Sequence, residues 1–152
     1  MALPTGSGTE TLHSHYFENV DDTSNQTLIF GVQHHVYTVL SIIVYCEVLN
    51  ATTDYGWLQM KTYDNHTSSG TGSTMIFARF NIQVGETYVW SDKFSFNGYE
   101  PSGTAVMSAA VQILNAAQGG SADAELQFTM TSADGGGQDY DVGITYLDQD
   151  WT

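Results

Sequence analysis

The stretch of sequence that most constrains the fold is residues 36–49, VYTVLSIIVYCEVL. It is rich in β-branched and aromatic residues and contains neither Gly nor Pro, which is typical of a long strand. One side is apolar and the other is mixed but still largely apolar, so the run predicts a central strand of a covered sheet. It is too short and too often interrupted by polar residues to cross a bilayer, which needs about 20 mainly apolar residues. The apolar side is expected to carry Val36, Thr38, Leu40, Ile42, Val44, Cys46 and Val48.

Other strand-like runs follow one another along the chain at the short spacing of all-β proteins. They cover residues 27–33, 55–64, 74–84, 87–97, 104–114, 122–130 and 139–147. With the central run they make about eight strands, and no run predicts a convincing helix. The sequence therefore predicts an all-β fold, an antiparallel two-sheet sandwich that is jelly-roll-like.

Four of these runs carry a more detailed expectation. Residues 74–84 and 87–97, joined by Gly85-Glu86, predict a hairpin. The 122–130 run alternates cleanly, with an inward set of Ala122, Ala124, Leu126, Phe128 and Met130 and an outward set of Asp123, Glu125, Gln127 and Thr129. The last run places Tyr140, Val142, Ile144 and Tyr146 on one face.

The chain divides into two parts by its periodicity. Residues 1–26 have a weak pattern and predict an extended N-terminal arm, either a floppy terminus or an assembly arm. Residues 27–152 predict a single β-sandwich domain. The expected assembly contacts are Leu12, Tyr16, Phe17 and Trp151.

The cellular setting is predicted from the N-terminus and from Cys46. The first residues contain no basic region followed by an apolar one, so no secretory signal is expected and the chain is predicted to fold in a reducing cytoplasm. Cys46 is the only cysteine, on the apolar side of the central run, and is interpreted as a buried structural thiol.

The charge balance limits the partners. The chain has 17 acidic and 3 basic residues, a formal net charge of −14, and only 13% charged residues, against about 25% in ordinary domains. Phosphate contacts need Lys and Arg, so binding to nucleic acid or to an anionic membrane is not expected. The composition is compatible with docking on a basic protein surface or with a high-salt environment.

Sequence motifs for catalysis are absent. There is no G-x-S-x-G elbow, and the glycines at 135–137 lie between strands without a following helix, Lys or Thr, which favours a turn over a phosphate-binding loop. The carboxylates do not cluster within a cleft pattern. The sequence therefore predicts a protein that is not an enzyme and has no cofactor.

Metal binding has weak candidates. Asp134, Asp139 and Asp141 flank the glycine loop and offer oxygen ligands for Ca²⁺, but their spacing does not match a known calcium loop, and a solvated acidic loop is the favoured interpretation. The neighbours His34 and His35 point to opposite faces of a strand, which argues against a shared zinc ion. His13 and His15 can share a face, but they lie in the predicted arm.

Four segments together resemble a known family: HHVYTVLSIIVYCEVLN, FARFNIQVGETYVWSDKFSF, a later patch of alternating residues, and the ending DVGITYLDQDWT. The pattern resembles small accessory virion proteins of tailed bacteriophages, especially marine and cyanobacterial phages, over roughly residues 27–150. The matching residues are Asn81, Ile82, Val84, Gly85, Glu86, Thr87, Trp90, Asp92 and Lys93, with Tyr146, Leu147 and Asp148 at the end.

The resemblance implies a non-enzymatic structural subunit of a phage particle, made in the host cytoplasm. It favours a capsid decoration or cement protein, a homotrimer that contacts the major capsid protein or another virion protein. The alternatives are a tail, neck or fibre component, or a carbohydrate- or receptor-binding module that uses Trp57, Trp151 or Tyr99. The chain has few basic residues to protect sheet edges, so contacts between copies are expected to cover those edges.

Overall fold

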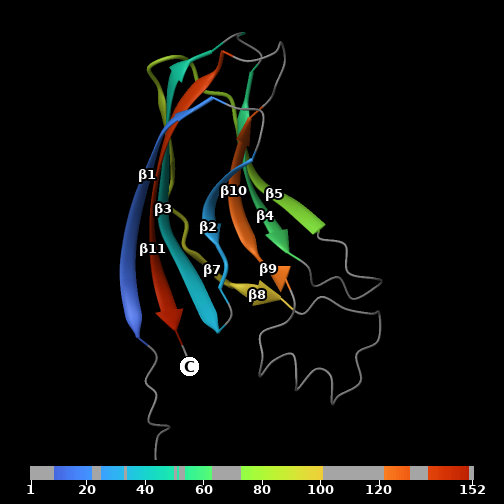
Figure 1. Ribbon diagram of the computed structural model, residues 1–152. Helices are drawn as coiled ribbons and strands as arrows, with labels where there is room; N and C mark the ends of the chain where they lie inside the picture. The colour runs from blue at the N-terminus through green and yellow to red at the C-terminus, as the bar shows by residue number, and fades with distance from the viewer. Residues whose placement is uncertain are drawn as a thin grey trace, which may run out of the picture.

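The protein is an antiparallel β-sandwich, and this part of the sequence prediction is confirmed. The structure is a computed structural model that describes residues 9–21, 25–32, 34–49, 51, 54–62, 73–100, 122–130 and 137–150. Two sheets pack face to face (Figure 1). Within the described residues there is no helix, and hence none with the length and apolar character to span a membrane.

The first sheet has five strands. Its order is β1 (Glu10–Val20), β11 (Asp139–Asp150), β3 (His35–Val48), then β6 (Thr87–Trp90) and β7 (Phe94–Asn97), which both pair with the far side of β3. All neighbours are antiparallel. The predicted central strand is therefore central, since β3 lies between β11 and the β6 and β7 pair.

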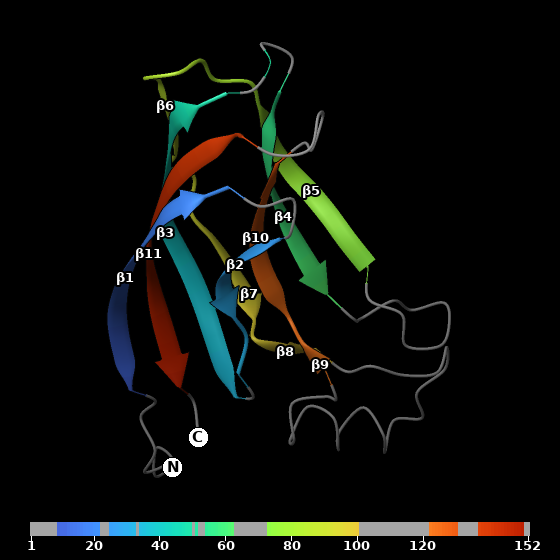
Figure 2. The ribbon, with the colours of Figure 1, turned by 45° about the horizontal axis from the view of Figure 1, so that its top comes forward.

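The second sheet has four strands and covers one face of the first. Its order is β2 (Gln26–Phe30), β10 (Glu125–Met130), β4 (Gly56–Thr62) and β5 (Ser73–Phe80). A separate two-stranded sheet joins β8 (Tyr99–Glu100) to β9 (Ala122–Asp123). Figure 2 shows β1 and β5 at the outer edges of the two main sheets. The predicted strand at residues 104–114 lies outside the described residues.

The buried face of β3 changes side in the middle of the strand. Ile42, Val44 and Cys46 are buried as predicted, but in the first half Tyr37 and Val39 are buried, in place of the even-numbered residues. The pairing with β11 explains this, because Ser41 pairs with Thr145 and Val39 with Tyr146, which leaves Leu40 as an extra, bulged residue. One extra residue reverses the side to which the following side chains point.

A bulge also changes the buried face in β2 and β5. In β2, Leu28 is bulged, so Leu28 and Ile29 are both buried while Phe30 is exposed. In β5, Phe77 is bulged, so Ala78 and Phe80 are buried whereas Ile76, predicted on the same face, is exposed. Val32 and Val84, the last residues of the predicted faces, are also exposed.

The hairpin predicted at Gly85-Glu86 is wrong. β5 belongs to the second sheet and β6 to the first, so this turn carries the chain from one sheet to the other. The Gly85 backbone N–H donates to the Cys46 carbonyl at 2.8 Å, and the Glu86 carbonyl accepts from the Cys46 N–H at 3.0 Å. Hydrogen bonding to β3, rather than to β5, therefore directs the returning chain.

The predicted N-terminal arm contains a strand. Residues Glu10–Val20, placed in the arm at 1–26, form β1 and pair with β11 along almost their whole length. This edge strand keeps most of its side chains exposed, so its sequence does not need the strong apolar alternation of a covered strand. The sheet therefore begins well before residue 27.

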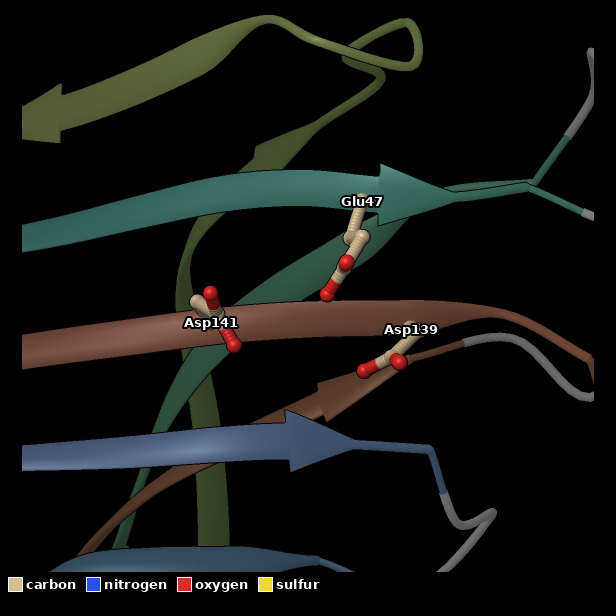
Figure 3. A group of neighbouring side chains, drawn as sticks. All are labelled: Glu47, Asp139 and Asp141. Carbon is tan, nitrogen blue, oxygen red and sulfur yellow. The ribbon is translucent and has the colours of Figure 1, made fainter.

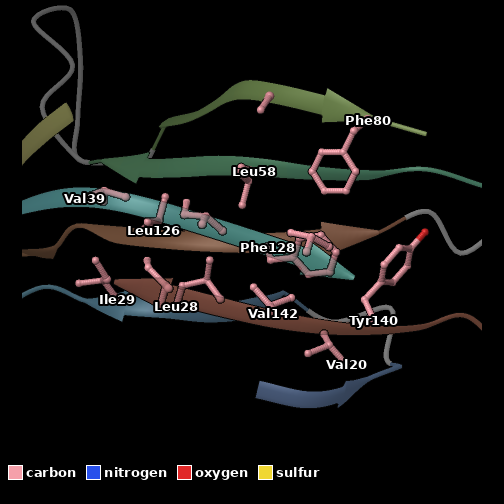
Figure 4. Close-up of a cluster of buried hydrophobic side chains, with 14 of the residues drawn as sticks. Val20, Leu28, Ile29, Val39, Leu58, Phe80, Leu126, Phe128, Tyr140 and Val142 are labelled. Carbon is pink, nitrogen blue, oxygen red and sulfur yellow. The ribbon is translucent and has the colours of Figure 1, made fainter. Parts of the chain in front are cut away.

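The core lies between the two sheets (Figure 4). The predicted face of β11 is confirmed, since its four alternating residues from Tyr140 to Tyr146 are buried. Phe128 is fully buried, with its ring stacked on Phe80 at 6.0 Å and edge-on to Tyr140 at 5.4 Å between centroids. Cys46 is a buried free thiol as predicted, and burial raises its pKa to about 11.

β10 is buried on both faces. Its predicted inward residues from Ala124 to Met130 are buried, and the outer residues Gln127 and Thr129 are buried as well. Gln127 accepts a hydrogen bond from Gln59 at 2.8 Å, and the Thr129 hydroxyl donates to Asn25 at 2.6 Å. Because β10 has a neighbour on each side, long side chains from those strands cover its outer face.

A backbone junction ties the two sheets together at one corner. Gly31 follows β2, Gly98 follows β7 and Ala124 precedes β10. The Gly31 N–H donates to the Ala124 carbonyl at 2.8 Å, and the Ala124 N–H donates to the Gly98 carbonyl at 3.0 Å. A Cβ at Gly31 would overlap the Gly98 carbonyl oxygen and lie 2.6 Å from that of Ala124, so this close approach requires glycine.

Candidate functional site

The outer face of the five-stranded sheet, the face turned away from the second sheet, carries exposed apolar side chains in one row. Tyr16 on β1 pairs with Gly143 on β11, Gly143 pairs with Ile43 on β3, and Ile43 pairs with Val89 on β6. The exposed fractions of Tyr16, Ile43 and Val89 are 60%, 46% and 55%. These three side chains, the apolar row, cross the sheet over about 14 Å, three strand spacings.

Other side chains of the same face include exposed apolar residues and small hydroxylated ones. Leu12 and Tyr45 are exposed beside the row. Ser14 bonds Thr145 at 3.1 Å through their hydroxyls, and Thr38 bonds Ser95 at 2.7 Å in the same way. These hydroxyls form hydrogen bonds with one another across strands. The apolar row is therefore the part of the face that gains most from contact with a partner.

Three carboxylates gather at one end of this face: Glu47, Asp139 and Asp141, the acidic trio (Figure 3). One oxygen of each lies within 4.8 Å of the others. Glu47 is the extra residue where the pairing of β3 and β11 shifts between Asp139 and Tyr140. A second irregularity, in β1 between Phe17 and Val20, flanks Asp141 from the other side. The two bulges bring the carboxylates of neighbouring strands together.

Within the trio, Asp141 is well satisfied. It accepts a hydrogen bond from the Tyr16 hydroxyl at 2.7 Å and from the Asn19 backbone N–H at 3.2 Å. The hydrogen bond to Asp141 is the main cause that raises the pKa of Tyr16 to about 12. The trio is therefore coupled to the apolar row through Tyr16.

Asp139 is the member of the trio whose charged form is disfavoured. Burial, followed by the charges of Asp141 and Asp21, raises its pKa above the usual value. Its buried Oδ1 has no hydrogen-bond partner among the described residues. The negative charge of Asp139 is therefore poorly compensated within the molecule.

None of the five strands that form this face contains a lysine or arginine. Lys61 pairs with Glu125 at 3.0 Å in the four-stranded sheet. Arg79 in β5 lies over the ring of Tyr55 at 3.4 Å, and Lys93 lies in the connection between β6 and β7. The strands of the outer face therefore combine apolar side chains with acids and contain no lysine or arginine, while Lys93 lies in a connection at the edge of the sheet.

The structure brings together part of the predicted calcium site. Asp139 and Asp141 are neighbours, Asp134 lies outside the described residues, and the sequence analysis missed Glu47. Ca²⁺ takes about six to eight oxygen ligands. The trio brings one oxygen of each carboxylate together, which makes three ligands, so the trio alone does not define a metal site.

The histidines are arranged differently from a zinc site. His13 and His15 share a face as expected, with ring centroids 5.8 Å apart, and His35 contacts Asp148 at 2.7 Å. His13 lies 3.9 Å from the same carboxylate. Apart from the acidic trio, no three His, Cys or acidic ligands in the described parts of the chain lie within 4.8 Å of one another.

The predicted assembly residues fall in different places. Leu12 and Tyr16 are exposed on the outer face, whereas Phe17 points to the opposite side and packs against the core. Trp151 lies outside the described residues. Trp57 is half-buried and donates its indole N–H to Gln59 at 2.8 Å, and the side chain of Tyr99 is not among those described. The role of these residues in assembly or binding stays a prediction.

Comparisons of the chain with protein-family models, with curated proteins and with solved structures find no match. The fold and this face define the class of the protein by themselves: an antiparallel β-sandwich with one exposed sheet face that is apolar and acidic.

Replacing Asp139 with Asn is expected to stabilise the protein at pH 7. An acid whose pKa is raised on folding loses stability as the pH rises from its ordinary value through its raised value, and the amide removes this loss. The gain should be on the order of 0.5 kcal/mol, or about 1–2 °C in melting temperature, and should vanish below about pH 3.5. Thermal melts of wild type and variant across pH provide the measurement.

The matched control is Asp141→Asn. It weakens the acceptor of the Tyr16 and Asn19 hydrogen bonds and should therefore not stabilise the protein. Equal gains from the two variants would show that the environment of Asp139 is not special.

Proposed function

We propose that this protein is a non-enzymatic structural component of a tailed bacteriophage particle, a capsid decoration or cement protein that docks through the outer face of its five-stranded sheet. The apolar row is the observation that carries the proposal. Exposed apolar side chains aligned across four strands are costly in a free protein and are typical of an interaction site.

Two further features support a structural role over a catalytic one. The acidic trio lies at the paired ends of β3 and β11, with Glu47 exposed to solvent. The carboxylate with the raised pKa, Asp139, has other acids rather than a nucleophile as its charged neighbours. The family resemblance supports a place in a phage particle, with the major capsid protein or another virion protein as partner. It also supports a homotrimer, in which the sheet edges contact other copies of the chain.

The test is the location of the protein in particles. Purified phage particles that encode this chain are expected to contain it, and gold-labelled antibody should mark the head surface in electron micrographs. Labelling confined to the tail or fibres would replace decoration of the head by a tail role. Complete absence of the protein from particles would overturn the proposal.

A further inference from the structure

Gly143 lies at the centre of the apolar row, and no contact within the protein requires glycine at this position. It lies in the interior of β11, between Tyr16 on one side and Ile43 on the other. Its φ is not in the left-handed region, and a Cβ built on it would meet nothing within 4 Å. In contrast to Gly31 and Gly98, whose Cβ atoms would clash with backbone, the fold does not require glycine here.

Glycine within a strand weakens the strand, and the reasons for it there include a bulge, a tight bend, or the close approach of a ligand or of another backbone. At Gly143 it leaves a gap in the apolar row, here called the notch, because no side chain stands between the exposed Tyr16 and Ile43 of the two neighbouring strands. A notch with apolar walls and no side chain at its floor fits an apolar side chain from a partner. A partner side chain that enters this gap would act as an anchor residue of the interface.

The negative charges of the acidic trio, next to the notch, favour a partner with a basic side chain. Asp141 is two residues from Gly143 along β11, about 7 Å, and it belongs to the acidic trio. None of the five strands of this face contains a lysine or arginine, so a second copy docked strand face to strand face would bring further acids and no bases on those strands. A partner with a Lys or Arg about 7 Å from its apolar anchor would offset part of the negative charge of the trio, which includes Asp139 with its unpaired Oδ1 among the described residues.

We propose that the notch at Gly143 receives an apolar side chain of another virion protein, and that a neighbouring Lys or Arg of that protein pairs with the acidic trio. This inference rests on the proposed function, because it takes the partner to be part of the particle. It goes further by assigning the point of contact and the chemistry of the partner.

Rebinding to particles tests the inference. Particles from a phage deleted for the gene are mixed with purified protein and sedimented, and the bound fraction is measured at about 50 mM and about 500 mM NaCl. Gly143→Val is expected to fill the notch and weaken binding about tenfold or more, while it raises the melting temperature by about 2 °C because valine favours strands. Glu47→Gln combined with Asp139→Asn should weaken binding at low salt and flatten its salt dependence, with the Tyr16–Asp141 hydrogen bond intact.

A matched pair of variants serves as control and protects against misfolding of Gly143→Val. Ile43→Ser should weaken binding, whereas Ile76→Ser, at a comparably exposed position of the other sheet, should not. If wild type binds and the Gly143, Ile43 and acid variants bind equally well, the inference is overturned and the proposed function stands. If wild type does not bind particles at all, both fall. Self-association that Gly143→Val abolishes would make the face a contact between copies and would also overturn the inference.

Discussion

Gly31→Ala is expected to destabilise the protein by roughly 3 kcal/mol or more, which corresponds to a fall of about 6–12 °C in melting temperature. The added methyl group would meet two backbone carbonyl oxygens, those of Gly98 and Ala124, and not a side chain that can rotate away. Relief therefore requires the junction between the sheets to open, with loss of the hydrogen bond from Gly31 to Ala124. A thermal melt followed by circular dichroism gives the measurement.

Gly143→Ala is the control for this variant. It makes the same chemical change in a strand where nothing lies within 4 Å of the new Cβ, so stability should be unchanged or slightly increased. A Gly31→Ala protein as stable as wild type would show that the two sheets do not depend on this backbone junction.

Phe128→Ala is expected to cost about 3–5 kcal/mol, the range for loss of a fully buried aromatic side chain. The ring fills the space between Phe80 and Tyr140, and it also occupies the position next to Gly56, whose absent Cβ would lie 2.9 Å from it. Since three elements meet at this ring, the cavity cannot close by the movement of one side chain. The midpoint of urea unfolding measures the loss.

Phe96→Ala provides the comparison for Phe128→Ala. It deletes the same ring from a partly buried position on β7 and should cost clearly less. Equal costs for the two variants would mean that the core does not centre on Phe128.

The sequence predicted the class of fold because strand alternation is a local property. In β11 and β10 the inward residues follow a strict period of two, and the structure buries them as expected. The prediction failed where one residue is inserted into the pairing, as at Leu40 in β3 and Phe77 in β5. A bulge is set by the partner strand, so the pattern of a single strand does not reveal it.

The partners of each strand were also not readable from the sequence. Residues 74–84 and 87–97 have the pattern of a hairpin, but the hydrogen bonds of Gly85 and Glu86 go to Cys46, which is distant in sequence. The sequence did not predict β1, because an edge strand with exposed side chains has little apolar periodicity.

The sequence predicted some residues of the candidate site but not that they lie together. Tyr16 and Leu12 were named as contacts, and Asp139 and Asp141 as acidic neighbours. Ile43, Val89 and Glu47 were not connected with them, because the register across four strands brings these residues together. The alternation of β3 placed Ile43 on the mixed, less covered side, which was the available signal.

The position of β11 between β1 and β3 has a consequence for synthesis of the protein. β1 and β3 have no common neighbour until β11 has been made, more than 100 residues after β1. Joining of these strands into one sheet therefore waits for synthesis of β11, and such distant pairings form on the slow scale of about milliseconds to seconds. A ribosome that stops before Asp139 releases a chain whose longest strand, β3, presents an open apolar edge. Such unfinished chains are the form of this protein most exposed to aggregation.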